Sequence, residues 1–241
     1  GGGGGRGRGG AGECVGELAL VDPHASGLEA GLARIVGMLK GQKEPPVCDS
    51  CTRERVANIV TSLPFVFHGA GHLKAARTAA ERRYAASVIG VGAGASLYHA
   101  TWGEEVKGYA RMVDYGSIAA SALCMLQVLH PGTSLQWRIY TALGCVAHPL
   151  AVAGVTSLRL EGRYLRAAQA SKDARVRGAH RRHVGTALLA GALFAAEELF
   201  PQVPLLHAAW HVAAFATVGQ LERGLLPPQL VRRGRRLGRG R

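Results

Sequence analysis

The residues of this sequence best suited to chemistry are His207 and His211, which lie four positions apart in the apolar run 205–219. On a helix this spacing puts both imidazoles on one face, one turn apart. No formal charge occurs from Pro204 to Gln220, which is typical of a membrane-spanning helix. Two histidines in such a helix either hydrogen-bond to neighbouring helices or bind one metal ion together with a third ligand from elsewhere.

The composition favours a membrane protein made of helices. The 241 residues are 48% hydrophobic and include 34 glycines, enough for one bundle of six or seven helices. The mean hydropathy of +0.09 averages very polar ends with apolar blocks of about 18 to 20 residues, the length that spans a bilayer. The net charge of +13 comes from Lys and Arg in connectors and in the tail, not from a recognition helix with interleaved aromatics, so we expect no nucleic-acid partner.

Three regions follow from the pattern along the chain. Residues 1–47 form a Gly-rich leader that we predict to be disordered, with a possible amphipathic surface helix at 27–40. Residues 48–224 form an all-α domain of about seven transmembrane helices, and residues 225–241 form a basic cytosolic tail. The predicted helices cover 53–72, 84–102, 112–129, 135–147, 149–168, 183–200 and the run that begins near 205. Gly90, Gly92 and Gly94 predict close packing of the second helix.

The distribution of positive charge predicts the topology. Alternating helices place the connectors 74–83, 130–138 and 163–182 and the C-terminal tail on one side, and these segments hold most of the Lys and Arg residues. The connectors near 104–111, 148 and 201–204 hold only Lys107 and Arg111. By the positive-inside rule, the C-terminus is predicted to be cytosolic, in an endomembrane or in the plasma membrane.

When the helices alternate across the membrane in this way, several polar groups lie near the opposite, non-cytosolic side. They are His99 at the end of the second helix, Asp114 at the start of the third, Glu197 and Glu198 at the end of the sixth, and His207 and His211. Three histidines with an open fourth position form the usual catalytic zinc arrangement, in which water is bound with a pKa of about 7. Asp114 would then accept a proton from this water, and the Ser96 hydroxyl would hold the developing oxyanion.

At these residues the sequence resembles the CREST superfamily of membrane hydrolases, which includes alkaline ceramidases, progestin/adiponectin receptors and a GPI-processing lipase family. The resemblance covers about 48–221 and rests on SLYH at 96–99, RMVDYGSIA at 111–119 and HAAWH at 207–211. It implies a seven-helix fold with zinc held by His99, His207 and His211, and with Ser96 and Asp114 nearest the water. Two departures are that Ser96 lies three residues before the histidine rather than four, and that Asp114 lies further along than in ceramidases. Asp49, Glu54 and Asn58 loosely resemble the ceramidase calcium region, but its run of acids and Trp is absent, so no calcium is predicted.

The function predicted from these observations is a zinc-dependent hydrolase that cleaves an amide or ester bond of a membrane lipid, as a ceramidase-like amidase or a phospholipase-like esterase. One alternative is a receptor-like or scaffolding protein in which zinc only braces the helices. Another is a histidine-lined transporter, which would distribute polar residues along a path through the membrane, whereas here they gather at one end.

The remaining polar residues and cysteines have simpler interpretations. His68 and His72 are expected to bond between helices, Glu104 and Glu105 to lie in a solvated turn, and Glu197 and Glu198 either to orient a ligand histidine or to face water. We expect His130, His148, His180 and His183 to lie in connectors. Cys48 and Cys51 have the spacing of half a zinc site but no second pair, so they form a local disulfide or two free thiols, and Cys14, Cys124 and Cys145 are expected to be packing residues.

Overall fold

The computed structural model describes residue 49 and residues 51–226, except 131, 133, 201 and 202. The predicted leader at 1–47, with its possible helix at 27–40, and the predicted tail beyond residue 226 lie outside the described residues. Within the part that is described, the fold is entirely helical, which confirms the all-α prediction. Its helices are α2 (Thr52–Ala75), α3 (Ala79–Ala100), α4 (Glu104–Leu129), α5 (Leu135–Ala147), α6 (Pro149–Ala170), α7 (Ala174–Leu199) and α8 (Leu206–Leu225).

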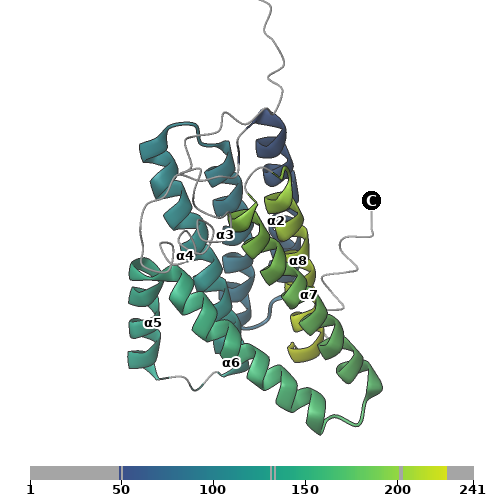
Figure 1. Ribbon diagram of the computed structural model, residues 1–241. Coiled ribbons are helices and arrows are strands. Elements are labelled where there is room, and N and C mark those ends of the chain that lie inside the picture. The colour runs from purple at the N-terminus through teal and green to yellow at the C-terminus, as the bar shows by residue number, and fades with distance from the viewer. Residues whose placement is uncertain (1–48, 50, 131, 133, 201–202, 227–241) are drawn as a thin grey trace, which may run out of the picture.

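The helices form a closed bundle in which the first and last ones are neighbours (Figure 1). Helix α3 packs between α2 and α4, and α8 packs between α2 and α7. Helix α6 closes the ring by contacting α4 on one side and α7 on the other, while α5 packs against α4 and α6 at the edge. This arrangement brings the end of α3 and the start of α8, which are far apart in sequence, to one end of the bundle.

Two glycines of α3 permit close approach of its neighbours, as the sequence predicted. A Cβ atom on Gly92 would lie 2.8 Å from the backbone oxygen of Ser62 in α2, and one on Gly94 would lie 3.3 Å from the Cα atom of Asp114 in α4. Gly90 has more room, since the nearest atom to an added Cβ lies 3.9 Å away. Close backbone contact therefore sets the positions of α2 and α4 relative to the helix that carries His99.

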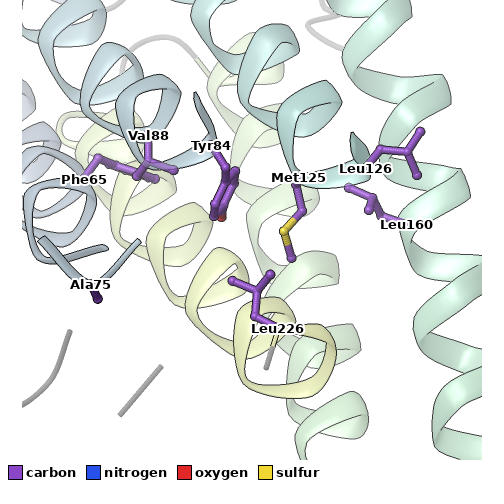
Figure 2. Close-up of a cluster of buried hydrophobic side chains, with 8 residues drawn as sticks. All are labelled: Phe65, Ala75, Tyr84, Val88, Met125, Leu126, Leu160 and Leu226. Carbon is purple, nitrogen blue, oxygen red and sulfur yellow. The ribbon is translucent and has the colours of Figure 1, made fainter. Parts of the chain in front are cut away.

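The apolar core lies toward the other end of α2 and α8. Phe65, Tyr84, Val88 and Met125 are buried together, and Leu160 and Leu226 join them from α6 and from the end of α8 (Figure 2). Burial of a large apolar side chain contributes roughly 1.5–3 kcal/mol. The two ends of the bundle are therefore held differently, one by this core and the other by the polar contacts described below.

Helix α4 is a candidate membrane span. By length and composition, Glu105–Leu129 is the one stretch of the described residues that is long and apolar enough to cross a membrane. Helices α6 and α7 carry several arginines along their length, among them Arg159, Arg163 and Arg181, which lowers their hydropathy. The prediction of about seven membrane spans therefore stays a prediction.

Two predicted connectors are wrong because the flanking helices are longer than expected. Residues 104–107 form the first turn of α4 rather than a connector, and the Lys107 ammonium is turned inward, 2.9 Å from a carboxylate oxygen of Asp49. Most of 163–182 is helical too, since α6 continues to Ala170 and α7 begins at Ala174. Asp173 caps α7 by accepting a bond from the backbone nitrogen of Arg175 at 2.7 Å, and arginine has a high helix propensity.

Candidate metal centre

Three histidines from two helices converge at one end of the bundle. His99 lies in the last turn of α3, and His207 and His211 lie on one face of the first turns of α8. One ring nitrogen from each lies within 4.8 Å of the other two. His99 and His211 are buried, and the side chain of His207 is only 11% exposed. The structure thus brings together the three residues that the sequence predicted as metal ligands.

Each of these imidazoles is held through its Nδ1 atom by an oxygen of another segment. Asp49 lies 2.9 Å from Nδ1 of His99, and Glu197 lies 2.8 Å from Nδ1 of His207. The Thr61 hydroxyl lies 3.0 Å from Nδ1 of His211. This hydroxyl also donates to the backbone oxygen of Ala57 at 2.8 Å, so its oxygen is left to accept from the His211 ring. All three contacts favour the tautomer with the proton on Nδ1.

The Nε2 atoms of the three histidines are therefore free to bind a ligand. All three are buried, and none has a hydrogen-bond partner among the described residues. A buried nitrogen lone pair without a partner is costly. Three such nitrogens in one cluster of imidazoles, with the other nitrogen of each ring held by an oxygen, match a histidine site for zinc. Three imidazole nitrogens are thus suitable ligands for zinc, the metal that the resemblance to the CREST superfamily implies.

Asp49 and Lys107 complete a polar network behind His99 that the sequence analysis missed. The Asp49 carboxylate is buried and accepts from Nδ2 of Asn58 and from Nζ of Lys107, each at 2.9 Å, in addition to its contact with His99. Burial alone would raise the pKa of Asp49, but the bonds and charges of His99, Lys107 and Asn58 hold this pKa well below its usual range. The carboxylate therefore stays ionised and accepts from the His99 ring.

Asp114 and Ser96, the predicted catalytic residues, lie beside the histidines on the two neighbouring helices. Asp114 is 2% exposed and lies within electrostatic range of His207. The hydroxyl oxygen of Ser96 is buried and has no hydrogen-bond partner in the part of the chain that is described. Ser96 precedes His99 by three residues, so both share one face of α3.

The other candidates are partly as expected. Glu197 orients His207, which is one of the two roles considered for it, whereas the side chain of Glu198 lies outside the described residues. His68 and His72 bond between helices, to Glu222 of α8. His180 and His183 do not lie in a connector, since both belong to α7, where they contact Glu161 of α6.

The residues that sequence reasoning missed had weak signals. Thr61 and Asn58 are polar residues in a helix, and Asp49 lies just outside one. The contacts of Thr61 with His211, of Asp49 with His99 and of Asn58 with Asp49 form only when α2, α3 and α8 pack together. Cys51 at the N-cap of α2 is disulfide-bonded, which favours the disulfide over free thiols, while Cys124 and Cys145 are free.

No protein-family model, curated protein or solved structure matches this chain. Three imidazole nitrogens can hold one divalent metal ion, and the buried carboxylate and hydroxyl beside them can move a proton and donate a hydrogen bond. This combination is suited to hydrolysis.

Proposed function

We propose that this protein is a membrane-embedded, zinc-dependent hydrolase of the CREST type, which cleaves an amide or ester bond of a lipid. The observation that carries the proposal is the set of three buried Nε2 atoms without partners, on His99, His207 and His211, each backed by an oxygen on its Nδ1 atom. A purely structural histidine cluster would be expected to use these nitrogens in hydrogen bonds.

His99, His207 and His211 would hold the zinc ion. Bound there, zinc would act as a Lewis acid and lower the pKa of water to about 7. The oxygens of Asp49, Glu197 and Thr61 keep the three rings in one orientation and one tautomer. Loss of such a backing group typically lowers metal affinity about 10- to 100-fold.

Asp114 would act as the general base and Ser96 as the hydrogen-bond donor. A carboxylate oxygen of Asp114 takes a proton from the attacking water, whose oxygen forms the new bond to the carbonyl carbon. Ser96 donates its hydroxyl proton in a hydrogen bond to the carbonyl oxygen, which becomes negative. When the bond from carbon to the leaving nitrogen or oxygen breaks, Asp114 returns its proton to that atom. General-base catalysis of this kind contributes about 10²- to 10⁴-fold in rate.

A lipid substrate is favoured by the outer surface of the bundle. Helix α4 meets the criterion for a membrane span, and large apolar side chains are exposed on several other helices, including Phe67 of α2, Leu143 of α5, Leu158 of α6 and Leu188 of α7. Exposed apolar surface on several helices suits contact with lipid. A substrate that enters from the bilayer would reach the site without crossing water.

Two features bear on the side of the membrane on which the metal centre lies, the distribution of positive charge and the disulfide of Cys51. The Lys and Arg residues on both sides of the 171–173 connector, together with those of the predicted tail, favour a metal centre on the side of the lumen or the exterior. Cys51 lies at the same end of the bundle as His99, since Asp49 contacts both His99 and Asn58 of α2. Its disulfide suits an oxidising compartment. These two independent features support the same topology.

The alternative is a receptor-like or scaffolding protein with a structural zinc. It is favoured by the network of Asp49, Lys107 and His99, which ties the segment before α2 to α3 and α4 and would brace the bundle. The test is to purify the full chain with zinc, to assay it against ceramides and glycerophospholipids, and to repeat the assay with the His207→Ala/His211→Ala variant. Release of fatty acid by the wild type alone supports the hydrolase. Equal release by both proteins contradicts it.

A further inference from the structure

A second group of metal-ligating side chains lies further along α2 and α8, and the proposed hydrolase does not use it. His68 and His72 are one turn apart on α2, and Glu222 faces them from α8. We call these three residues the His–Glu cluster. Glu222 lies three turns of α8 beyond His211, or about 16 Å along the helix, so the His–Glu cluster is separate from the metal centre. Figure 1 shows α2 and α8 running side by side.

The three potential ligand atoms converge closely. Nε2 of His68 lies 2.5 Å and Nε2 of His72 lies 3.1 Å from the same carboxylate oxygen, Oε2 of Glu222. The two Nε2 atoms are themselves 3.1 Å apart. Ligands about 2.0–2.1 Å from a tetrahedral zinc ion lie about 3.3 Å from one another. An ion can therefore be placed at normal distances from all three atoms if the ligand atoms of His68 and Glu222 move apart by about 0.8 Å.

Hydrogen bonds alone account poorly for this convergence. If both Nε2 atoms carry protons, both N–H groups must crowd onto Oε2 of Glu222 with their nitrogens only 3.1 Å apart, and if one does not, its lone pair faces the lone pairs of the carboxylate. Protonating His72 on both nitrogens does not help, because its Nδ1 atom is buried and has no acceptor among the described residues. A cation bound between the three atoms would remove these repulsions.

The Glu222 carboxylate also needs a positive charge. It is 2% exposed, and its described partners are His68, His72 and the hydroxyl of Tyr84, which donates to Oε1 at 2.6 Å. Among the described residues its ion-pair partners are these two histidines, which carry a positive charge only when protonated. A buried carboxylate is stabilised by a positive charge close to it, which a bound metal ion would supply. Tyr84, which is 2% exposed, occupies Oε1 and thereby leaves Oε2 for a ligand, and Figure 2 shows its side chain projecting from α3.

We propose that His68, His72 and Glu222 form a second site for a divalent first-row transition metal, with zinc as the expected occupant. Two imidazoles and one carboxylate are a common zinc ligand set, and imidazole suits this class of metals. The ion would tie α2 to α8, and through Tyr84 to α3, at the end of the bundle opposite the metal centre. This proposal does not depend on the proposed function, because it involves none of the residues of the three-histidine site.

The test is a count of bound zinc in the full-length protein, purified in detergent, stripped with a chelator and re-loaded with zinc. The His207→Ala/His211→Ala variant isolates the His–Glu cluster and is expected to keep one zinc ion per chain. Adding Glu222→Gln or, in a separate variant, the partly exposed His68→Ala should remove that ion. A His207→Ala/His211→Ala protein that is folded by circular dichroism and binds no zinc overturns the proposal, and so does retention of zinc in both further variants.

The matched control is the pair His180 and His183. Each contacts a different oxygen of Glu161, at 2.8 Å, so their ligand atoms do not meet at one point. Adding His180→Ala/His183→Ala to the His207→Ala/His211→Ala background should leave the zinc ion in place. Cobalt(II) provides a second measurement on that background without any further substitution. We expect bound cobalt(II) to absorb visible light and the absorption to disappear when added zinc displaces the cobalt. Absence of this absorption contradicts the second site.

Discussion

Glu197, at the end of α7, holds the Nδ1 atom of His207, in the first turn of α8, at 2.8 Å across the short connector between the two helices. This contact directs the opposite nitrogen of His207 toward His99 and His211, whose rings are centred 4.8 and 4.6 Å away. We therefore expect Glu197→Gln to lower the zinc affinity of the three-histidine site about 10- to 100-fold. The measurement is a competition titration with a chromogenic chelator, and Glu161→Gln, which alters the carboxylate beside His180 and His183, serves as the control. Unchanged affinity in Glu197→Gln would show that the contact does not orient the ligand.

Lys107→Met should destabilise the fold. The ammonium of Lys107 lies 2.9 Å from the buried Asp49 carboxylate, and removing one partner of a buried pair typically costs about 3–5 kcal/mol. Asn58 and His99 still contact Asp49, so we expect the lower end of this range. The measurement is thermal unfolding in detergent, with Lys74→Met, an exposed residue of α2, as the control. A Lys107→Met midpoint equal to that of the control would mean that the pair adds nothing to stability.

Gly92→Ala tests the contact between α2 and α3. The added methyl would lie 2.8 Å from the backbone oxygen of Ser62 and 2.9 Å from the backbone nitrogen of Val66, so one helix must move. Overpacking of this kind costs about 1–3 kcal/mol. Gly185→Ala, in α7, meets nothing within 4 Å and should instead stabilise the protein by up to about 1 kcal/mol. The two midpoints of thermal unfolding should therefore shift in opposite directions, and a shift in the same direction would argue against the tight contact.

The sequence predicted the helices better than it predicted their ends. His207 and His211 were recognisable as a pair because helix periodicity is local, and α5 has its predicted bounds. Asp49 and Lys107 were missed because their roles depend on the packing of α2, α3 and α4, which no local pattern encodes. Glu222 follows the apolar run of α8 and reads as a solvated helix end, although it is buried against His68 and His72. The start of α7 was missed because its basic residues resemble a connector.

The predicted topology places the C-terminus in the cytosol. A glycosylation acceptor on a flexible spacer after Arg241 should therefore stay unmodified in cells. The same acceptor inserted in the 201–204 connector, on the side of the metal centre, should be glycosylated. Both results are read as a change in electrophoretic mobility that an endoglycosidase reverses. Glycosylation of the C-terminal acceptor alone would show that the topology is the inverse of the predicted one, with the metal centre toward the cytosol.

Asp114→Asn separates hydrolysis from a structural role for the metal. The two side chains are nearly isosteric, but an amide cannot take a proton from water, so the loss in rate should be about 10²- to 10⁴-fold. Asp173→Asn, at the exposed N-cap of α7, is the control for the same chemical change elsewhere. Zinc content and the midpoint of thermal unfolding should match those of the wild type, so that a lower rate reports on the chemistry.

The measurement that tests the central claim most directly is the rate of fatty-acid release by zinc-loaded wild type, Asp114→Asn and Asp173→Asn on the lipid that the wild type hydrolyses fastest. We predict that wild type and Asp173→Asn are equally fast and that Asp114→Asn, with its zinc intact, is at least about 100-fold slower. Equal rates for all three proteins would contradict the proposed mechanism.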